Sequence, residues 1–163
     1  MPNALLIIFM LSTAVLGTAY VFQYGFGYAP CELCYYQRYP YMVVIALSGM
    51  GVMAQNKYFR LDRSTISLLL LLCAVLLVAD AGIAAYHTGV EYKWWEGPTA
   101  CTPTINFGGS AADRLAQLMQ APIIRCDVAP WSLAGISMAG YNFLIAATMS
   151  WFTIVSWLDF RRK

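Results

Sequence analysis

Long apolar stretches separated by polar segments are the main pattern of this chain. The stretch from about 5 to 24 has no charged residue, and its roughly 20 residues are enough for a helix to cross about 30 Å of hydrocarbon. Similar stretches run from about 65 to 86 and from about 138 to 158. Each predicts a membrane-spanning helix. A cleaved signal peptide is the alternative for the first, but residues 1–3 carry no basic side chain, so a retained span is expected.

A further span is less evident in the pattern. Residues 41–54 are apolar, but as a helix they reach only about 21 Å. The helix must therefore begin near Tyr35 or before and pass through Pro40, which gives a span of about 35–55. Proline usually bends a helix, and membranes tolerate such bends where neighbours satisfy the freed carbonyl. The sequence thus predicts an all-α membrane protein, a four-helix transmembrane bundle in which residues 1–163 form a single integral-membrane domain.

The composition agrees with a membrane protein. Of the 163 residues, 60% are hydrophobic and only 11% are charged, whereas soluble domains carry about 25% charged residues. This balance excludes disorder and an ordinary soluble globule, and makes the lipid bilayer the expected surroundings. The formal net charge of +2 gives no reason to expect a nucleic-acid partner.

The basic residues predict the orientation of the spans. Six of the ten lie in the segment 55–64 or in the C-terminal tail, and the positive-inside rule places that side in the cytoplasm. Both termini are then cytoplasmic, and two loops, about 25–35 and 87–137, face outward. The second outer loop contains a short amphipathic helical pattern at 111–120.

The five cysteines are sorted by this topology. Cys31, Cys34, Cys101 and Cys126 lie on the outer, oxidising side, and Cys73 lies inside a span, where a small buried apolar residue is expected. Four cysteines allow three pairings. The C-x-x-C spacing of Cys31 and Cys34 is that of redox-active dithiols, which by elimination leaves Cys101 with Cys126.

Three interpretations of the outer cysteines compete. Structural cross-links suit Cys101 and Cys126, which enclose a long loop, but a bridge between Cys31 and Cys34 constrains almost nothing. Four thiolates could bind zinc, but the chain has no second C-x-x-C and no zinc-ribbon pattern, so no metal site is expected. An exchanging pair of dithiols is favoured.

The spacing around the C-x-x-C adds a cation. On a helix that begins near Cys31, the residues Cys31, Cys34 and Arg38 share one face, while Gln37 points about 100° away and could bond a carbonyl. A thiolate at a helix N-terminus is stabilised by a neighbouring guanidinium. This favours a functional role for Arg38 over the alternative, an arginine that only extends its charge to the membrane surface. A dithiol pressed against lipid can reach a lipid-soluble acceptor, and two cysteine pairs suggest a relay.

At this point the chain resembles a known family. The run Pro30–Arg38, PCELCYYQR, resembles the P-C-x-L-C-x-x-[QE]-R signature of the bacterial disulfide bond formation protein B family, DsbB. Cys101, the stretch Arg125–Asp127 with Pro130-Trp131, and the tract Ser137–Asn142 also resemble that family. The resemblance covers nearly the whole chain, with the same spans and outer loops.

The resemblance implies a membrane dithiol:quinone oxidoreductase of the bacterial inner membrane. Such a protein re-oxidises a periplasmic thioredoxin-like thiol oxidase of the DsbA type and passes electrons to ubiquinone or menaquinone, which sustains disulfide bond formation. By position, Cys101 would be attacked by the partner, with Cys126 as its disulfide mate. The Cys31–Cys34 pair would then re-oxidise the Cys101–Cys126 pair.

The resemblance also assigns the quinone site. Cys34 would contact the quinone ring, Arg38 would stabilise both, and His87 and Gln37 would belong to the same pocket. Asp80, an acid inside a span, has no role that the resemblance assigns, and a buried pair with Arg38 is a hypothesis. The alternatives are a paralogue with a dedicated partner, an enzyme of the vitamin K epoxide reductase type, whose C-x-x-C lies on a late span, and a cross-linked tetraspan scaffold without redox activity.

Overall fold

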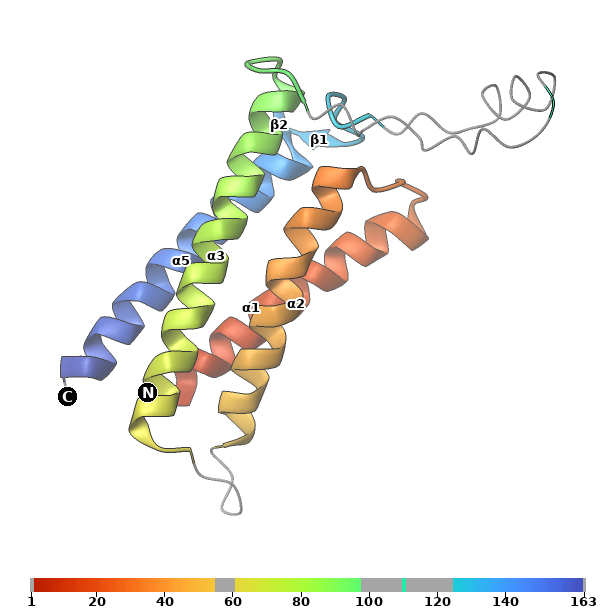
Figure 1. Cartoon of the computed structure of the whole chain (residues 1–163). Coiled ribbons are helices and arrows are strands. Elements are labelled where there is room, and N and C mark those ends of the chain that lie inside the picture. Colours follow the sequence, from red (N-terminus) through yellow and green to blue (C-terminus); the bar gives the residue numbers. More distant parts are fainter. Residues whose placement is uncertain (1, 55–60, 98–109, 111–124, 163) are drawn as a thin grey trace.

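The protein is mostly helical (Figure 1). The computed structural model describes residues 2–54, 61–97, 110 and 125–162. Its elements are helix α1 (Pro2–Tyr20), which continues as a π-helical segment η1 (Val21–Gly25), helices α2 (Glu32–Met53) and α3 (Arg63–Glu91), a hairpin of β1 (Ser132–Leu133) and β2 (Ile136–Ser137), and helix α5 (Met138–Arg162).

Within the described part of the chain, three segments are long and apolar enough to cross a membrane: Ala4–Gly25, Arg63–Glu91 and Met138–Arg162. They overlap three of the predicted spans. Helix α2 has 22 residues but is not one of these candidates, and Glu32 and Arg38 lie in its first two turns. The mostly helical structure is therefore consistent with an all-α membrane protein, while a four-span bundle stays a prediction. Helix α2 does run through Pro40, as its sequence indicates.

The helices pack in chain order. Helix α1 contacts α2, α2 contacts α3, and α3 contacts α5, which also touches α1. Gly51 of α2 allows the first of these contacts, because a Cβ there would lie 2.5 Å from Cδ1 of Leu5. Cys73 is free and fully buried among apolar side chains, which confirms its expected role as a core residue. The core cluster is Leu5, Ile8, Tyr41, Val44, Leu70, Cys73, Leu77 and Met149.

The two ends of the bundle differ in character. The start of α1, the end of α2, the start of α3 and the end of α5 lie at one end, and the start of α2, the end of α3 and the hairpin lie at the other (Figure 1). Arg63 and the basic pair Arg161 and Arg162 belong to the first end. The cysteines of the C-x-x-C belong to the second.

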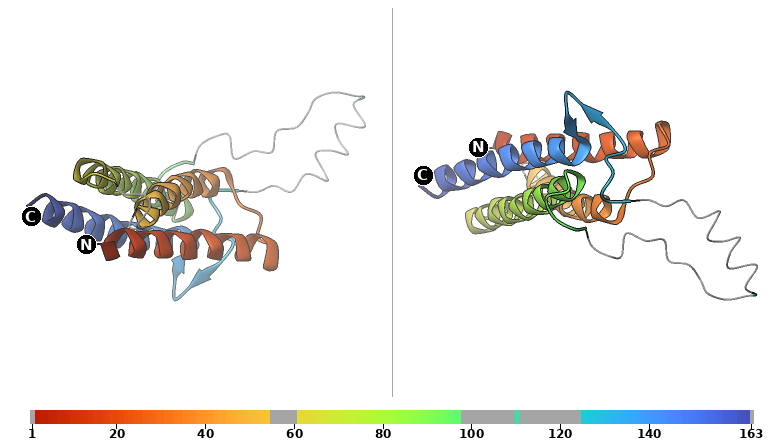
Figure 2. Two further views of the ribbon diagram at one scale, coloured as in Figure 1. Left: turned by 90° about the horizontal axis from the view of Figure 1, so that it is seen from below. Right: turned by 90° about the horizontal axis from the view of Figure 1, so that it is seen from above.

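The hairpin before α5 is an element that the hydrophobic pattern does not predict. Its turn residues, Ala134 and Gly135, have φ angles of 50° and 79°, as a two-residue primed turn requires. The hairpin lies on the side of α1 (Figure 2), and Trp131 packs edge-on against Phe22 of η1 with ring centroids 5.3 Å apart. The predicted short helix at 111–120 lies outside the described residues.

Candidate functional site

The C-x-x-C forms the start of α2. Cys31 is the N-cap, and its Sγ accepts a hydrogen bond from the backbone N–H of Cys34 at 3.3 Å. The two sulfurs are 2.8 Å apart and both thiols are free. Because the helix brings the sulfurs together, interconversion of dithiol and disulfide requires little motion of the backbone.

The two sulfurs are electrostatically unequal. The hydrogen bond with Cys34, followed by burial, raises the pKa of the Cys31 thiol. Cys31 therefore keeps its proton and donates it toward Cys34, whose sulfur lies over the first turn of α2. The positive end of the helix dipole stabilises negative charge there. The reduced pair can thus hold a thiolate at Cys34 with Cys31 as its hydrogen-bond donor.

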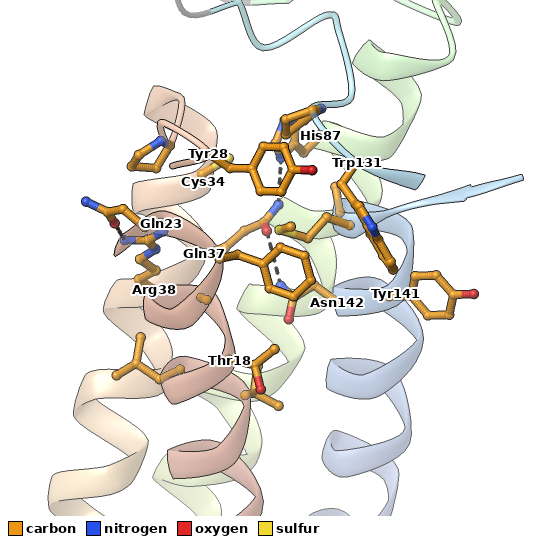
Figure 3. A pocket seen from close by; sticks show the side chains of 18 of the residues that line it. Thr18, Gln23, Tyr28, Cys34, Gln37, Arg38, His87, Trp131, Tyr141 and Asn142 are labelled. Atoms are coloured by element: carbon orange, nitrogen blue, oxygen red, sulfur yellow. Dashed lines mark hydrogen bonds between the residues drawn. The ribbon is translucent and has the colours of Figure 1, made fainter. Parts of the chain in front are cut away.

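Arg38 lies one turn further along α2 and is almost buried, with 8% of its surface exposed. Its guanidinium donates to Oε1 of Gln23 in η1 (Figure 3). It also lies over the rings of Tyr20 and Tyr35, 5.2 and 5.3 Å from their centroids. A buried cation held by a neutral amide and two rings keeps its charge available to a ligand.

A chain of polar side chains crosses the bundle beside the thiols. Nδ1 of His87 and Nε2 of Gln37 are 3.0 Å apart, and Nδ2 of Asn142 donates to Oε1 of Gln37 at 3.2 Å (Figure 3). The same Nδ2 donates to Oδ2 of Asp80 at 3.1 Å. At the other end of the chain, Nε2 of His87 lies 3.5 Å from Sγ of Cys31.

The hypothesis of an Asp80–Arg38 pair is wrong. Asp80 of α3 faces Asn142 of α5, whereas Arg38 of α2 faces Gln23 of η1, so the two side chains have different neighbours. Asn142 and Gln23 are functional candidates that the sequence reasoning missed. Each is a lone amide in an apolar stretch, and that isolation was the available signal.

A cavity of about 410 Å³ lies between α1, η1, α2, the end of α3, α5 and Trp131. Its walls are mainly apolar, and polar groups gather at one side (Figure 3). Of the two sulfurs in the C-x-x-C, only Cys34 is among the described lining residues. The polar lining residues near it include Gln23, Gln37, Arg38, His87, Glu91 and Asn142. A cavity of this size with few convergent polar groups suits a flat, largely apolar ligand.

The second cysteine pair is described in part. Cys126 is disulfide-bonded and 2% exposed, and it packs in one cluster with Cys31, Leu33 and Val90. The backbone of Cys126 is also a hydrogen-bonding partner of His87. Cys101 lies outside the described residues, so the Cys101–Cys126 pairing stays a prediction. The structure nevertheless brings one cysteine of the long segment between α3 and β1 next to the C-x-x-C.

Three metal-ligating side chains, Cys31, Cys34 and His87, have ligand atoms within 4.8 Å of one another. This set differs from the four-thiolate site weighed from the sequence. The nitrogen facing the thiols is Nε2. To bind a metal, Nε2 would have to be unprotonated. The hydrogen bond at the other ring nitrogen, Nδ1, determines which of the two carries the proton.

An ion cluster joins the Cys126 segment to the end of α3. Nη2 of Arg125 donates to Oδ2 of Asp127 at 2.6 Å, and Nζ of Lys93 bonds both the carboxylate and the backbone carbonyl of Asp127. Lys93 has a φ of 61°, a left-handed conformation that ends the helix and lets its side chain reach Asp127. Arg125, followed by Lys93, holds the pKa of Asp127 below its usual range.

Asp127→Asn should lower the thermal stability of the protein by a few degrees at most, because the cluster is exposed. A depressed pKa in the folded state stabilises above the ordinary Asp pKa of about 3.9 and loses that effect as the pH falls through the folded value. The Tm difference between the wild type and the variant should therefore be present at neutral pH and fade on acidification. A difference that grows at low pH would contradict the ion cluster.

Comparison with known proteins identifies similar chains. The family model of the disulfide bond formation protein DsbB matches residues 2–156. The uncharacterized protein RP370 of Rickettsia prowazekii is 31% identical over 144 residues, which cover 86% of this chain and 78% of that protein. The disulfide bond formation protein B of Aromatoleum aromaticum is 27% identical over 151 residues, covering 91% of this chain and 87% of the relative.

A further relative matches a shorter segment. The disulfide bond formation protein B 1 of Pseudomonas fluorescens is 26% identical over 88 residues, which cover 54% of this chain and 48% of the relative. No solved structure matches the chain. The family match, residues 2–156, includes Cys31, Cys34, Cys101 and Cys126 and every residue of the polar chain described above.

Proposed function

The chain belongs to the DsbB family of disulfide bond formation proteins, and on this premise we propose that it is a membrane dithiol:quinone oxidoreductase. Family membership assigns the coarse role, a membrane oxidoreductase in protein disulfide bond formation. The proposal adds the two reaction partners. A periplasmic thioredoxin-like thiol oxidase of the DsbA type delivers electrons, and a respiratory quinone, ubiquinone or menaquinone, receives them.

One observation supports the quinone as acceptor above all others. Cys34 faces the cavity of about 410 Å³ together with Arg38, while its partner Cys31 faces the cluster that contains Cys126. The C-x-x-C therefore lies between an apolar cavity and a cysteine of the outer loop. A quinone ring with two carbonyl oxygens fits apolar walls with a few donors. Arg38, His87 and Gln37 are the proposed donors beside it.

The relay is a sequence of balanced exchanges. A thiolate of the partner attacks Cys101 and breaks the Cys101–Cys126 disulfide, and the second thiol of the partner resolves the mixed disulfide. Cys101 and Cys126, now thiols, reduce the Cys31–Cys34 disulfide in the same way. Each exchange breaks one disulfide and forms one, so no external electron is needed.

The last step removes two electrons from the C-x-x-C. A bound quinone supplies the sink for two electrons and two protons. Cys34 reacts as the thiolate, and Cys31 gives up its proton and forms the disulfide with Cys34. The second proton balances the one that left Cys34 when its thiolate formed. Arg38 stabilises negative charge at this side of the cavity.

The proposed location is the bacterial inner membrane. Helix α2 would be a span in addition to the three candidates. Its polar first turns would lie at the outer surface, and Pro40 would lie inside the membrane. Arg63, Arg161 and Arg162 lie at the bundle end opposite the C-x-x-C. The positive-inside rule makes that end cytoplasmic, with both termini there and the cysteines on the periplasmic side.

The proposal is tested with protein purified in detergent, a reduced thioredoxin-like oxidase and a soluble ubiquinone analogue. Loss of the quinone absorbance should require both the protein and the reduced partner. Cys73→Ala is the matched control, since Cys73 lies in the core away from the site, and it should retain turnover. If all outer cysteines stay bridged and no quinone is reduced, the cross-linked scaffold is the better interpretation.

A further inference from the structure

The polar chain beside the C-x-x-C runs without interruption from the membrane interior to a reacting sulfur. It links Asp80, Asn142, Gln37, His87 and Cys31 through four side-chain contacts of 3.1, 3.2, 3.0 and 3.5 Å. Asp80 is fully buried, and Gln37 and His87 are 8% and 3% exposed. Asn142 is half-buried, and its amide bonds protein groups on both sides. The orientation of each amide therefore depends mainly on its protein neighbours.

The orientation of each group follows from the one before it. Oδ2 of Asp80 accepts, so Asn142 must present its NH₂ group, while Oδ1 of Asn142 accepts from the hydroxyl of Tyr41 at 3.0 Å. The second N–H of that NH₂ group donates to Oε1 of Gln37. The NH₂ group of Gln37 therefore faces Nδ1 of His87, which must accept.

We propose that Asp80 is a positioning residue that acts through Asn142 and Gln37 to hold His87 as the neutral tautomer with its proton on Nε2. The inference rests on the proposed function only where it concerns turnover. Its structural part holds whether Asp80 is charged or carries a proton on Oδ1, because Oδ2 accepts in either state. Among the described residues, Oδ1 has no hydrogen-bond partner.

The groups on the other side of the imidazole ring agree with this tautomer. Nε2 lies 3.5 Å from Sγ of Cys31 and 3.8 Å from Oε1 of Glu91. A sulfur and a carboxylate can each accept a hydrogen bond from a nitrogen that carries a proton. The other carboxylate oxygen of Glu91 accepts from the hydroxyl of Ser137, which orients that group.

The tautomer assigns the proton positions in the reduced C-x-x-C. Sγ of Cys31 accepts from Nε2 of His87 and from the N–H of Cys34, so its own proton points to Sγ of Cys34. Negative charge then stays on Cys34, the sulfur that faces the cavity. His87 is a donor that supports charge on sulfur, not a base that removes a proton from Cys31. Nε2 also offers no lone pair to a metal ion.

The test uses the fact that the chain has a single histidine. Labelling histidine with ¹⁵N gives two ring signals, and their couplings to the ring protons distinguish Nδ1 from Nε2 without further assignment. Spectra of the full chain in detergent, reduced with a small-molecule dithiol and free of quinone, should show the proton on Nε2. A proton on Nδ1 in the wild type would overturn the inference.

The decisive variant exchanges the two ends of the first hydrogen bond, Asp80→Asn with Asn142→Asp. Composition, charge and side-chain volume are unchanged, but the acceptor now stands at position 142. Gln37 must then turn its NH₂ group to position 142 and its oxygen to Nδ1, so the proton should move to Nδ1. If the proton stays on Nε2 in this variant, Asp80 does not act through the chain.

Gln37→Glu is the second variant, should the exchange fail to fold. A carboxylate at position 37 accepts from Asn142 and faces Nδ1, so a proton should appear on Nδ1. The role in turnover is read separately. The exchanged variant should lose about tenfold in kcat for quinone reduction, the effect of losing the one hydrogen bond to Cys31 that keeps its proton directed at the Cys34 thiolate, with little change in KM.

The two readouts separate the two proposals. An inverted tautomer with unchanged kcat would remove Asp80 as a positioning residue for the reaction. A wild type that reduces no quinone but shows the Nε2 proton would overturn the proposed function and leave the tautomer assignment standing.

Discussion

Replacing Cys34 with serine should lower the rate of quinone reduction by at least about 10³-fold, or roughly 4 kcal/mol of transition-state stabilisation. Serine has a similar size, but it cannot form a disulfide and so cannot release two electrons with Cys31. Cys34 is also the sulfur of the C-x-x-C that faces the cavity. The rate is followed as loss of the quinone absorbance with the reduced partner in excess.

A bypass distinguishes the two cysteine pairs. Cys126→Ser should block oxidation of the protein partner, but a small-molecule dithiol that reduces Cys31–Cys34 directly should restore quinone reduction. The same dithiol should not rescue Cys34→Ser. Thermal unfolding of both variants in detergent checks that they fold. A Cys34→Ser protein that reduces quinone at the normal rate would refute the assigned role of Cys34.

The helices could be predicted from the sequence because they depend on local pattern. An uncharged stretch such as 5–24 has few stable alternatives to a helix in lipid, since every backbone polar group must be satisfied internally. The hairpin could not be predicted in this way. Its strands have two residues each, too few for an alternating pattern, and only the Ala134-Gly135 turn marked its place.

In the candidate site, too, contacts within one helix could be predicted from the sequence and contacts between helices could not. Cys34 and Arg38 lie one turn apart on α2 and both line the cavity, so periodicity was sufficient to predict their common side, whereas the N-cap Cys31 faces the cluster with Cys126. The neighbours of Asp80 depend on how α3 meets α5, and an apolar stretch does not reveal which face turns toward which helix. The sequence therefore indicates the wrong hydrogen-bonding partner for Arg38. The partner in the structure is Gln23 of η1.

Replacing Arg38 with glutamine should raise the KM for a quinone analogue by about 10- to 100-fold. Arg38 is the only Lys or Arg among the described residues that line the cavity. A hydrogen bond from a charged donor is worth about 1.5–3 kcal/mol, and each 1.4 kcal/mol is a factor of ten in affinity. If Arg38 also stabilises the Cys34 thiolate, kcat should fall as well.

Two further variants locate the effect in the guanidinium and its position. Arg38→Lys keeps the charge but loses the planar group that lies over Tyr20 and Tyr35, so its KM should fall between those of the wild type and Arg38→Gln. Arg63→Gln removes the same charge at the opposite end of the bundle, where Arg63 donates to the carbonyl of Phe160 at 2.8 Å and lies over its ring. That control should leave both kinetic constants near the wild-type values. Equal losses in Arg63→Gln and Arg38→Gln would mean that net charge, rather than a cation at the cavity, governs quinone reduction.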